Sequence, residues 1–110
     1  MNDRTRSAVA LEVDVAATRA TRRRGLLGRE SLGATEGLLL TPCKAVHTVG
    51  MRFPIDVAFC DREGYVLHVS RLRPGRMSRP VVRAYFAIEA ADGSFERWKI
   101  NPGDIVEVKG

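Results

Sequence analysis

The chain has 110 residues and a mass of 12.2 kDa, which suits one folded domain around a single hydrophobic core. Hydrophobic residues make up 45% and charged residues 28%, which excludes a low-complexity disordered protein, and no apolar run is long enough for a membrane-spanning helix. The net charge is +5, and all but three of the 18 basic residues are Arg. We expect a flexible N-terminus over residues 1–7 and a single domain over residues 8–110.

The N-terminal half of the chain alternates short apolar segments with turn residues. Residues 8–15 place apolar side chains at a period of two, which is typical of a half-buried strand. A short helix is predicted over residues 18–27, and its consecutive arginines 22–24 would spread around its surface rather than face one partner. Residues 38–40 are predicted to be a short buried segment, and residues 46–49 are β-branched, which favours an extended conformation.

A hairpin is predicted at the centre of the chain, from strands over residues 55–61 and 65–71. A three-residue loop over residues 62–64 ends in a glycine, which suits the left-handed position that such a loop requires. We prefer this loop to a four-residue one because it gathers the large apolar side chains on one face, with Phe59 opposite Leu67.

The last third of the chain begins with residues 71–83, which are rich in Arg and turn residues and are predicted to be an irregular loop. A strand over residues 82–88 lacks clean alternation, so it should be covered on both faces. Ser94 can cap one helical turn, residues 101–104 have the pattern of a type II turn, and residues 105–108 form a closing strand. Together these elements predict an α+β domain, a small mainly antiparallel sheet curled into a partial barrel with two short helices.

Asp56 and His68 are the candidate acid–base pair. In the predicted register Asp56 faces Ser70, and His68 is its diagonal neighbour, within reach of longer side chains. A carboxylate beside an imidazole fixes its tautomer and raises its pKa, as general-base chemistry requires. We favour the alternative that Asp56, which follows Pro54 at the start of a strand, accepts hydrogen bonds from nearby backbone N–H groups. Cys60 on the same face is more commonly a buried thiol than a nucleophile.

A zinc site is not expected, although the chain has the residue types of a Cys₂His₂ set in Cys43, His47, Cys60 and His68. There is no CxxC motif, and Cys43 and His47 would lie about 13 Å apart in an extended segment. Glycine-rich phosphate cradles and RNA-binding motifs are also missing. We therefore expect neither a metal nor another cofactor.

Several motifs follow one another along the chain: Gly25–Leu32, Gly37–Leu40, Cys43–Thr48, the block Met51-Arg52-Phe53-Pro54-Ile55-Asp56-Val57, and Ile100–Asp104. On these residues the sequence resembles the domain-of-unknown-function family DUF192 over nearly all of residues 9–108. The resemblance implies a compact, mostly antiparallel, barrel-like α+β domain and no established activity, cofactor or substrate. The family's central motif maps onto the candidate ligand-binding residues, which are His47, Met51, Pro54 and Asp56. The sequence departs from the family at Thr21, where relatives tend to carry an acid, and at Lys99, near which relatives tend to end the second helix with a glycine.

The leading hypothesis is a non-enzymatic binding or accessory module with a semi-polar site near His47, Met51 and Asp56 for a small ligand or a protein segment. A second hypothesis is a small hydrolase-like enzyme that uses Asp56 with His47 or His68. A third is an electrostatic binder of nucleic acid or acidic partners through residues 71–83 and the Arg22 cluster, although too few stacking aromatics are present for nucleic acid to be our expectation. No membrane partner is expected, and no signal indicates an oligomeric state. The first residues lack a secretory signal, so we expect a cytoplasmic protein with reduced thiols.

Overall fold

The computed structural model describes residues 8–12, 14–16 and 37–109, with side chains over residues 37–107. The strands are β1 (Ala8–Glu12), β2 (Asp14–Ala16), β3 (Gly37–Leu40), β4 (Ile55–Cys60), β5 (Val66–Leu72), β6 (Phe86–Ala91) and β7 (Ile105–Lys109). The helix in this part of the chain is α2 (Ser94–Arg97), a single turn between β6 and β7.

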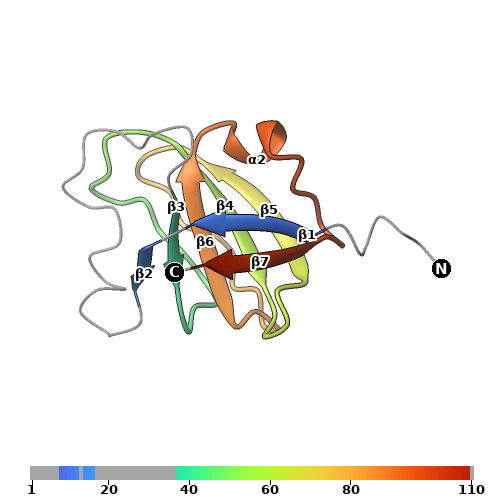
Figure 1. Ribbon diagram of the computed structural model, residues 1–110. Helices are drawn as coiled ribbons and strands as arrows, with labels where there is room; N and C mark the ends of the chain where they lie inside the picture. The colour runs from blue at the N-terminus through green and yellow to red at the C-terminus, as the bar shows by residue number, and fades with distance from the viewer. Residues whose placement is uncertain (1–7, 13, 17–36, 110) are drawn as a thin grey trace.

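The main sheet has five strands in the order β2-β3-β6-β4-β5. The strands β3, β6, β4 and β5 run antiparallel to their neighbours, whereas β2 is parallel to β3. A second sheet pairs β1 with β7 in parallel and lies across the main sheet (Figure 1). The predicted mainly antiparallel sheet with little helix is therefore confirmed, and the sheet is open between its edge strands β2 and β5.

Of the elements predicted for the N-terminal part, one needs correction and the others lie outside the described residues. In place of the single strand expected over residues 8–15 there are two strands, because β1 pairs with β7 while β2 pairs with β3. The expected flexible residues 1–7 and the expected helix over residues 18–27, with its three arginines, lie outside the described residues.

The other predicted elements differ from the structure mainly in their limits. The β-branched residues 46–49 form no strand and make only an isolated bridge between His47 and Met77. The last long strand begins at Phe86 rather than at Val82, because residues 81–84 form a turn closed by a backbone hydrogen bond of 2.9 Å.

The central strands β4 and β6 are buried on both faces of the sheet, as their apolar sequences require. One face, here called the helix face, packs against α2 and buries a cluster that includes Ala58, Cys60, Ile88, Phe95 and Ile100. The other, here called the loop face, packs against the loops that follow β3 and β5 and buries Val46, Met51, Ile55, Val57 and Phe59. Because side chains alternate along a strand, neighbouring residues of β4 contribute to opposite faces.

Within the described residues, no helix is both long enough and apolar enough to cross a membrane.

The turn after α2 contains Lys99 with a φ of 59°, a left-handed backbone conformation that residues other than glycine rarely adopt. The resemblance to DUF192 predicts a glycine near this position, and the lysine holds a backbone conformation that suits a glycine.

Candidate functional site: a pocket beneath the short helix

The hairpin of β4 and β5 has the predicted loop and a different register. The residues that flank the loop over residues 62–64 are joined by a backbone hydrogen bond of 3.0 Å, and Gly64 has a φ of 87°. Cys60 then lies opposite Val66 as predicted, but a β-bulge between Cys60 and Phe59 places Phe59 opposite His68 rather than opposite Leu67. Beyond the bulge the predicted register is therefore wrong by one residue, because β5 accommodates one more residue than β4 at this point.

The bulge separates Asp56 from His68. Asp56 lies opposite Arg71 on the helix face, whereas His68 lies opposite Phe59 on the loop face. The His68 ring stacks on Phe59 with 6.5 Å between ring centroids, and its Nε2 is hydrogen-bonded to Ser70 Oγ at 2.8 Å. The acid–base pair predicted for Asp56 and His68 does not form, because the sheet lies between the two side chains.

The Asp56 carboxylate anchors α2 to the sheet. Its Oδ2 accepts a hydrogen bond from the backbone N–H of Phe95 at 3.1 Å, and its Oδ1 accepts one from Arg71 Nε at 3.3 Å. The residue before α2 is Gly93, which has no side chain to cap the helix. Asp56, which is only 3% exposed, therefore supplies from β4 the acceptor that a capping residue would supply. A backbone N–H partner was expected, but it comes from 39 residues away.

Arg71 links this anchor to a second acidic residue. Its Nε lies 2.7 Å from Asp92 Oδ1, and its side chain is 57% exposed. The hydrogen bond with Asp56, together with the charges of Asp92 and Glu96, raises the pKa of Arg71 above its ordinary value. Two carboxylates therefore contact one guanidinium, and Glu96 contributes a further negative charge nearby.

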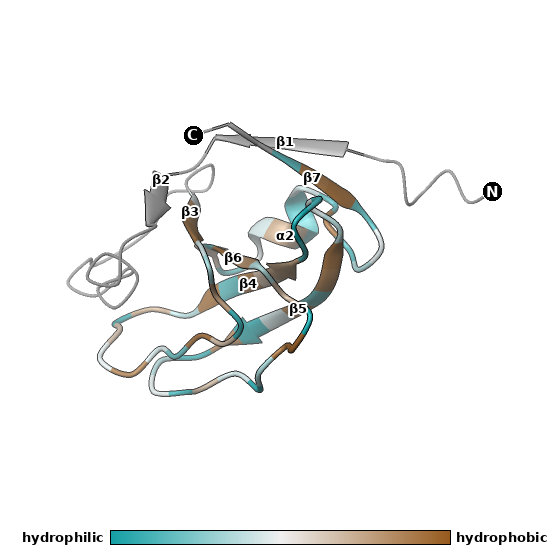
Figure 2. Cartoon of the chain, turned by 90° about the horizontal axis from the view of Figure 1, so that it is seen from below, coloured by the Kyte–Doolittle hydropathy of each residue, from teal (hydrophilic) through white to brown (hydrophobic). Residues whose placement is uncertain are grey.

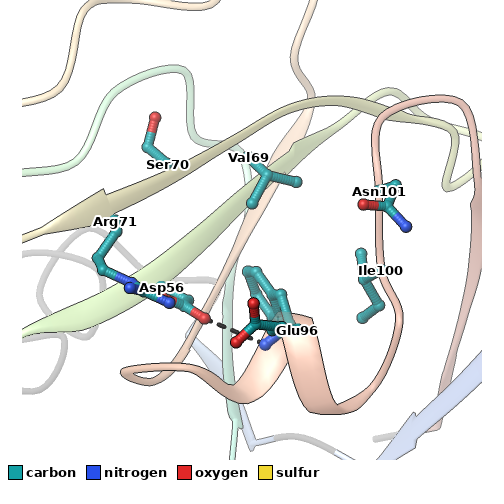
Figure 3. A pocket seen from close by; sticks show the side chains of 8 residues that line it. Asp56, Val69, Ser70, Arg71, Glu96, Ile100 and Asn101 are labelled. Carbon is teal, nitrogen blue, oxygen red and sulfur yellow. Dashed lines mark hydrogen bonds and ion pairs between the residues drawn. The ribbon is translucent and has the colours of Figure 1, made fainter.

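A pocket of about 370 Å³ opens next to these residues, between β5 and α2 (Figure 3). It is lined by Asp56, Val69, Ser70, Arg71, Phe95, Glu96, Ile100 and Asn101. Figure 3 shows that the Val69 and Ser70 side chains point to opposite sides of β5, which leaves Val69 and Ile100 as apolar walls. The pocket thus combines apolar walls with a charged rim.

The other predicted ligand-binding residues lie apart from this pocket. Met51 is buried in the core of the loop face, and His47 is exposed in the same loop. Pro54 is half-buried and precedes β4 directly. The structure brings Asp56 together with Arg71 and α2, but places Asp56 on the face opposite to Met51. A ligand-binding role for these four residues stays a prediction.

Cys60 lacks the properties of a catalytic nucleophile. Its side chain is fully buried on the helix face, and burial, with a smaller contribution from the charge of Asp61, raises the pKa of the thiol to about 12. Cys60 and Cys43 are not joined in a disulfide. Among the described residues, no group of three His, Cys, Asp or Glu side chains is placed to hold a metal ion.

Glu89 is a buried acid that the sequence analysis does not single out. It lies at the middle of β6 on the loop face, opposite Val57 on one side and Leu38 on the other. It is 3% exposed, its Oε1 has no hydrogen-bond partner among the described residues, and burial raises its pKa to about 7. The signal that could have identified Glu89 from the sequence is its place inside a strand that the pattern predicts to be covered on both faces.

Comparison with known proteins identifies both a family and a shared fold. The profile of the family described as "Uncharacterized ACR" (DUF192) matches residues 1–108. A protein of unknown function from Novosphingobium aromaticivorans DSM 12444 superposes with a TM-score of 0.75 at 22% identity, covering 83% of this chain and 70% of that chain. A putative transcription regulator from Sinorhizobium meliloti 1021 gives a TM-score of 0.73 at 20% identity, covering 83% and 76%. At such identities the likeness concerns the fold alone. No protein with a curated function matches this chain.

Proposed function

Because the chain belongs to the DUF192 family, whose function is unknown, we propose a function from its own geometry: a small non-enzymatic binding module. Its pocket beside Asp56 accepts a cationic group on an apolar stem, such as the basic side chain of a protein segment or a small organic amine. The observation that carries this proposal is the pocket itself, where apolar walls meet the carboxylates of Asp56 and Glu96 and the guanidinium of Arg71.

The charges at the rim favour a cation over an anion. Arg71 is already bonded to Asp56 and Asp92, which leaves Glu96 on α2 as the acid that can pair with a ligand. The ion pair between Glu96 and the ligand would be exposed, so we expect it to contribute about 0.5–1 kcal/mol to the free energy of binding. An alkyl stem against Val69 and Ile100 adds about 0.8 kcal/mol for each methylene that it buries.

A binding role has more support than the hydrolase alternative. Both oxygens of Asp56 accept hydrogen bonds that hold the fold, and the Cys60 thiol is buried. The hydrogen bond between His68 and Ser70 has the residue types of a nucleophile and its base. Within residues 37–107, however, no carboxylate contacts this imidazole to orient it, as a complete catalytic set requires.

The setting that we propose is the cytoplasm, where both thiols would stay reduced.

We also expect the open sheet to curl into a partial barrel. The isolated bridge between Tyr65 and Ile105 supports this curl, because it links the start of β5 to the start of β7.

The test is a titration of isotope-labelled protein followed by NMR, with N-acetyl-lysine methylamide as the cationic probe and N-acetyl-glutamate methylamide as the anionic one. We expect the lysine probe to shift the amides of Val69, Phe95, Glu96 and Ile100, and the glutamate probe to leave them unchanged. Glu96→Gln should lower the affinity for the lysine probe by about threefold, the effect of one exposed ion pair.

The matched control is Glu63→Gln, which removes one exposed negative charge from the hairpin loop, outside the pocket. It should leave the affinity for the lysine probe unchanged. Equal shifts with both probes, or equal losses in both variants, would contradict the proposed ligand chemistry.

A further inference from the structure

The two loops on the loop face form one ordered surface that the pocket does not involve. Residues 41–54 and 73–85, here called the loop pair, run side by side and project together from the sheet (Figure 2). Backbone hydrogen bonds of 2.7–2.9 Å join them at successive levels, from Cys43 with Tyr85, through Lys44 with Val81 and Val46 with Ser78, to Thr48 with Arg76. The loop pair is therefore held as a ribbon.

Thr48 fixes the end of this ribbon that adjoins β5. Its side chain is fully buried, and its Oγ1 donates to the carbonyl of Arg73 at 2.6 Å and accepts from the N–H of Arg76 at 2.8 Å. The backbone of the arginine-rich loop is thus tied down by hydrogen bonds that use none of its guanidinium groups.

The loop pair carries only one sign of charge. It has six basic residues and no acidic one, and all six are exposed: Lys44, Arg52, Arg73, Arg76, Arg79 and Arg83. The Lys44 ammonium donates to the carbonyls of Val82 and Ala84 at 2.5 and 2.9 Å. Within the described part of the chain, none of the five arginines forms an ion pair, so their guanidinium groups remain available to an anionic partner.

Exposed apolar side chains lie between these charges. Val82, Met77 and Val49 are 76%, 73% and 56% exposed. The hydrogen-bonded levels place them near one end, the middle and the other end of the ribbon. The seven residues from Cys43 to Val49 would span about 20 Å when extended, so the apolar positions are spread along a line rather than gathered at one point.

We propose that the loop pair is a docking surface for an acidic segment of another protein, which lies extended along the ribbon and places apolar side chains against Val49, Met77 and Val82. Its carboxylates would pair with the arginines. An extended segment of about six residues matches the length of the ribbon. This proposal does not depend on the pocket.

The same observations disfavour the other polyanions. Single-stranded nucleic acid stacks on exposed aromatic rings, whereas Phe53 is half-buried and Tyr85 lies under the guanidinium of Arg62 at 4.3 Å. The sugar–phosphate backbone of a duplex would leave the exposed Met77 and Val82 side chains without apolar contacts.

The experiment measures fluorescence anisotropy of the whole chain with labelled probes: a peptide of alternating Glu and Leu, one of alternating Glu and Ser, and a short DNA duplex. Sedimentation with phosphatidylglycerol vesicles tests the membrane. We expect the Glu-Leu peptide to bind at least about fivefold more tightly than the Glu-Ser peptide, since its leucines bury apolar area. Arg79→Gln with Arg83→Gln should lower the affinity for the Glu-Leu peptide by about threefold or more.

The matched control is Arg97→Gln with Lys99→Gln, which removes the same charge on and after α2, outside the loop pair, and should leave this affinity nearly unchanged. Met77→Ser with Val82→Ser should abolish the preference for the Glu-Leu peptide. Tighter binding of the duplex or the vesicles, no binding of the peptide at millimolar concentration, or equal losses in the two arginine variants would overturn the proposal.

Discussion

The pocket and the loop pair lie on opposite faces of the same sheet and use charge in opposite ways. In the pocket, Asp56 and Arg71 hold the structure together, because the carboxylate anchors α2 and the guanidinium bridges two acids. In the loop pair, backbone hydrogen bonds and the Thr48 hydroxyl hold the structure, and the arginines take no part in it. Substitutions of Asp56 or Arg71 should therefore affect stability, whereas substitutions of the loop-pair arginines should affect binding.

Two glycines allow a comparison of the backbone in the hairpin loop with the backbone in the loop pair, and we expect the largest effect here. A Cβ at Gly64 would lie 2.4 Å from the carbonyl oxygen of Val106, whereas one at Gly75 would meet nothing within 4 Å. Both have positive φ, so each alanine adds about 1 kcal/mol of backbone strain. Gly64→Ala should lower the free energy of unfolding by more than about 3 kcal/mol, because the backbone must also move.

Urea denaturation of the Gly64→Ala and Gly75→Ala variants measures this difference directly. Gly75→Ala serves as the control, with a loss of about 1 kcal/mol. Equal losses would show that Gly64 does not pack closely against β7.

Replacing Asp56 should have the next largest effect on stability. Asp56→Ala leaves the buried N–H of Phe95 without an acceptor and should lower the free energy of unfolding by about 2–3 kcal/mol. Asp56→Asn keeps one acceptor oxygen and should lose less. Arg76→Gln in the loop pair should change stability by no more than about 0.5 kcal/mol. A loss of the same size in Arg76→Gln and Asp56→Ala, measured by urea denaturation, would contradict the contrast between the regions.

The two buried acids of the sheet offer a comparison through pH. Asp56 has hydrogen-bond partners, whereas burial raises the pKa of Glu89 from 4.5 to about 7. Below about pH 4.5 Glu89 is protonated in both the folded and the unfolded state and its ionisation costs nothing. As pH rises to about 7 the unfolded state ionises first, so stability falls, by roughly 3 kcal/mol at most. Glu89→Gln should remove this decrease.

Denaturation at pH 5 and pH 8 checks the sign of the Glu89 effect. The free energy of unfolding of the native sequence should fall between these values relative to that of Glu89→Gln. An identical change in both proteins would mean that Glu89 is not the titrating group.

The smallest effect concerns the turn that follows α2. Lys99 has a φ of 59°, which glycine adopts without steric cost. Lys99→Gly should raise the free energy of unfolding by up to about 1 kcal/mol. Arg97→Gly, a control inside α2, should lower it by about the same amount. A loss of thermal stability in Lys99→Gly would show that its side chain contributes more than its backbone strain costs.

Local sequence patterns predict the local elements of this molecule well. Gly64 predicts the hairpin loop, the apolar run of β4 predicts a buried strand, and residues 101–104 predict the turn, which is closed by a backbone hydrogen bond of 3.0 Å. These features depend on residues within a few positions of one another. The motif shared with DUF192 likewise identifies the family.

The site could not be predicted in the same way, because its contacts join distant segments. The bulge near Phe59 depends on how β5 packs, and it moves His68 to the face opposite Asp56. The partner of Asp56 is the N–H of Phe95, and no pattern around Asp56 indicates it. The arginines over residues 71–83 are visible in the sequence, but their separation into Arg71 in the pocket and the others on the loop pair requires the fold.

The most direct test of the account is one NMR experiment on the same labelled protein, titrated first with N-acetyl-lysine methylamide and then with the Glu-Leu peptide. The account predicts two separate sets of shifted amides, one around Phe95 and Glu96 for the lysine probe and one along residues 41–54 and 73–85 for the acidic peptide. If both probes shift the same residues, or if the peptide shifts the amides of the pocket, the claim that the two faces bind opposite charges is contradicted.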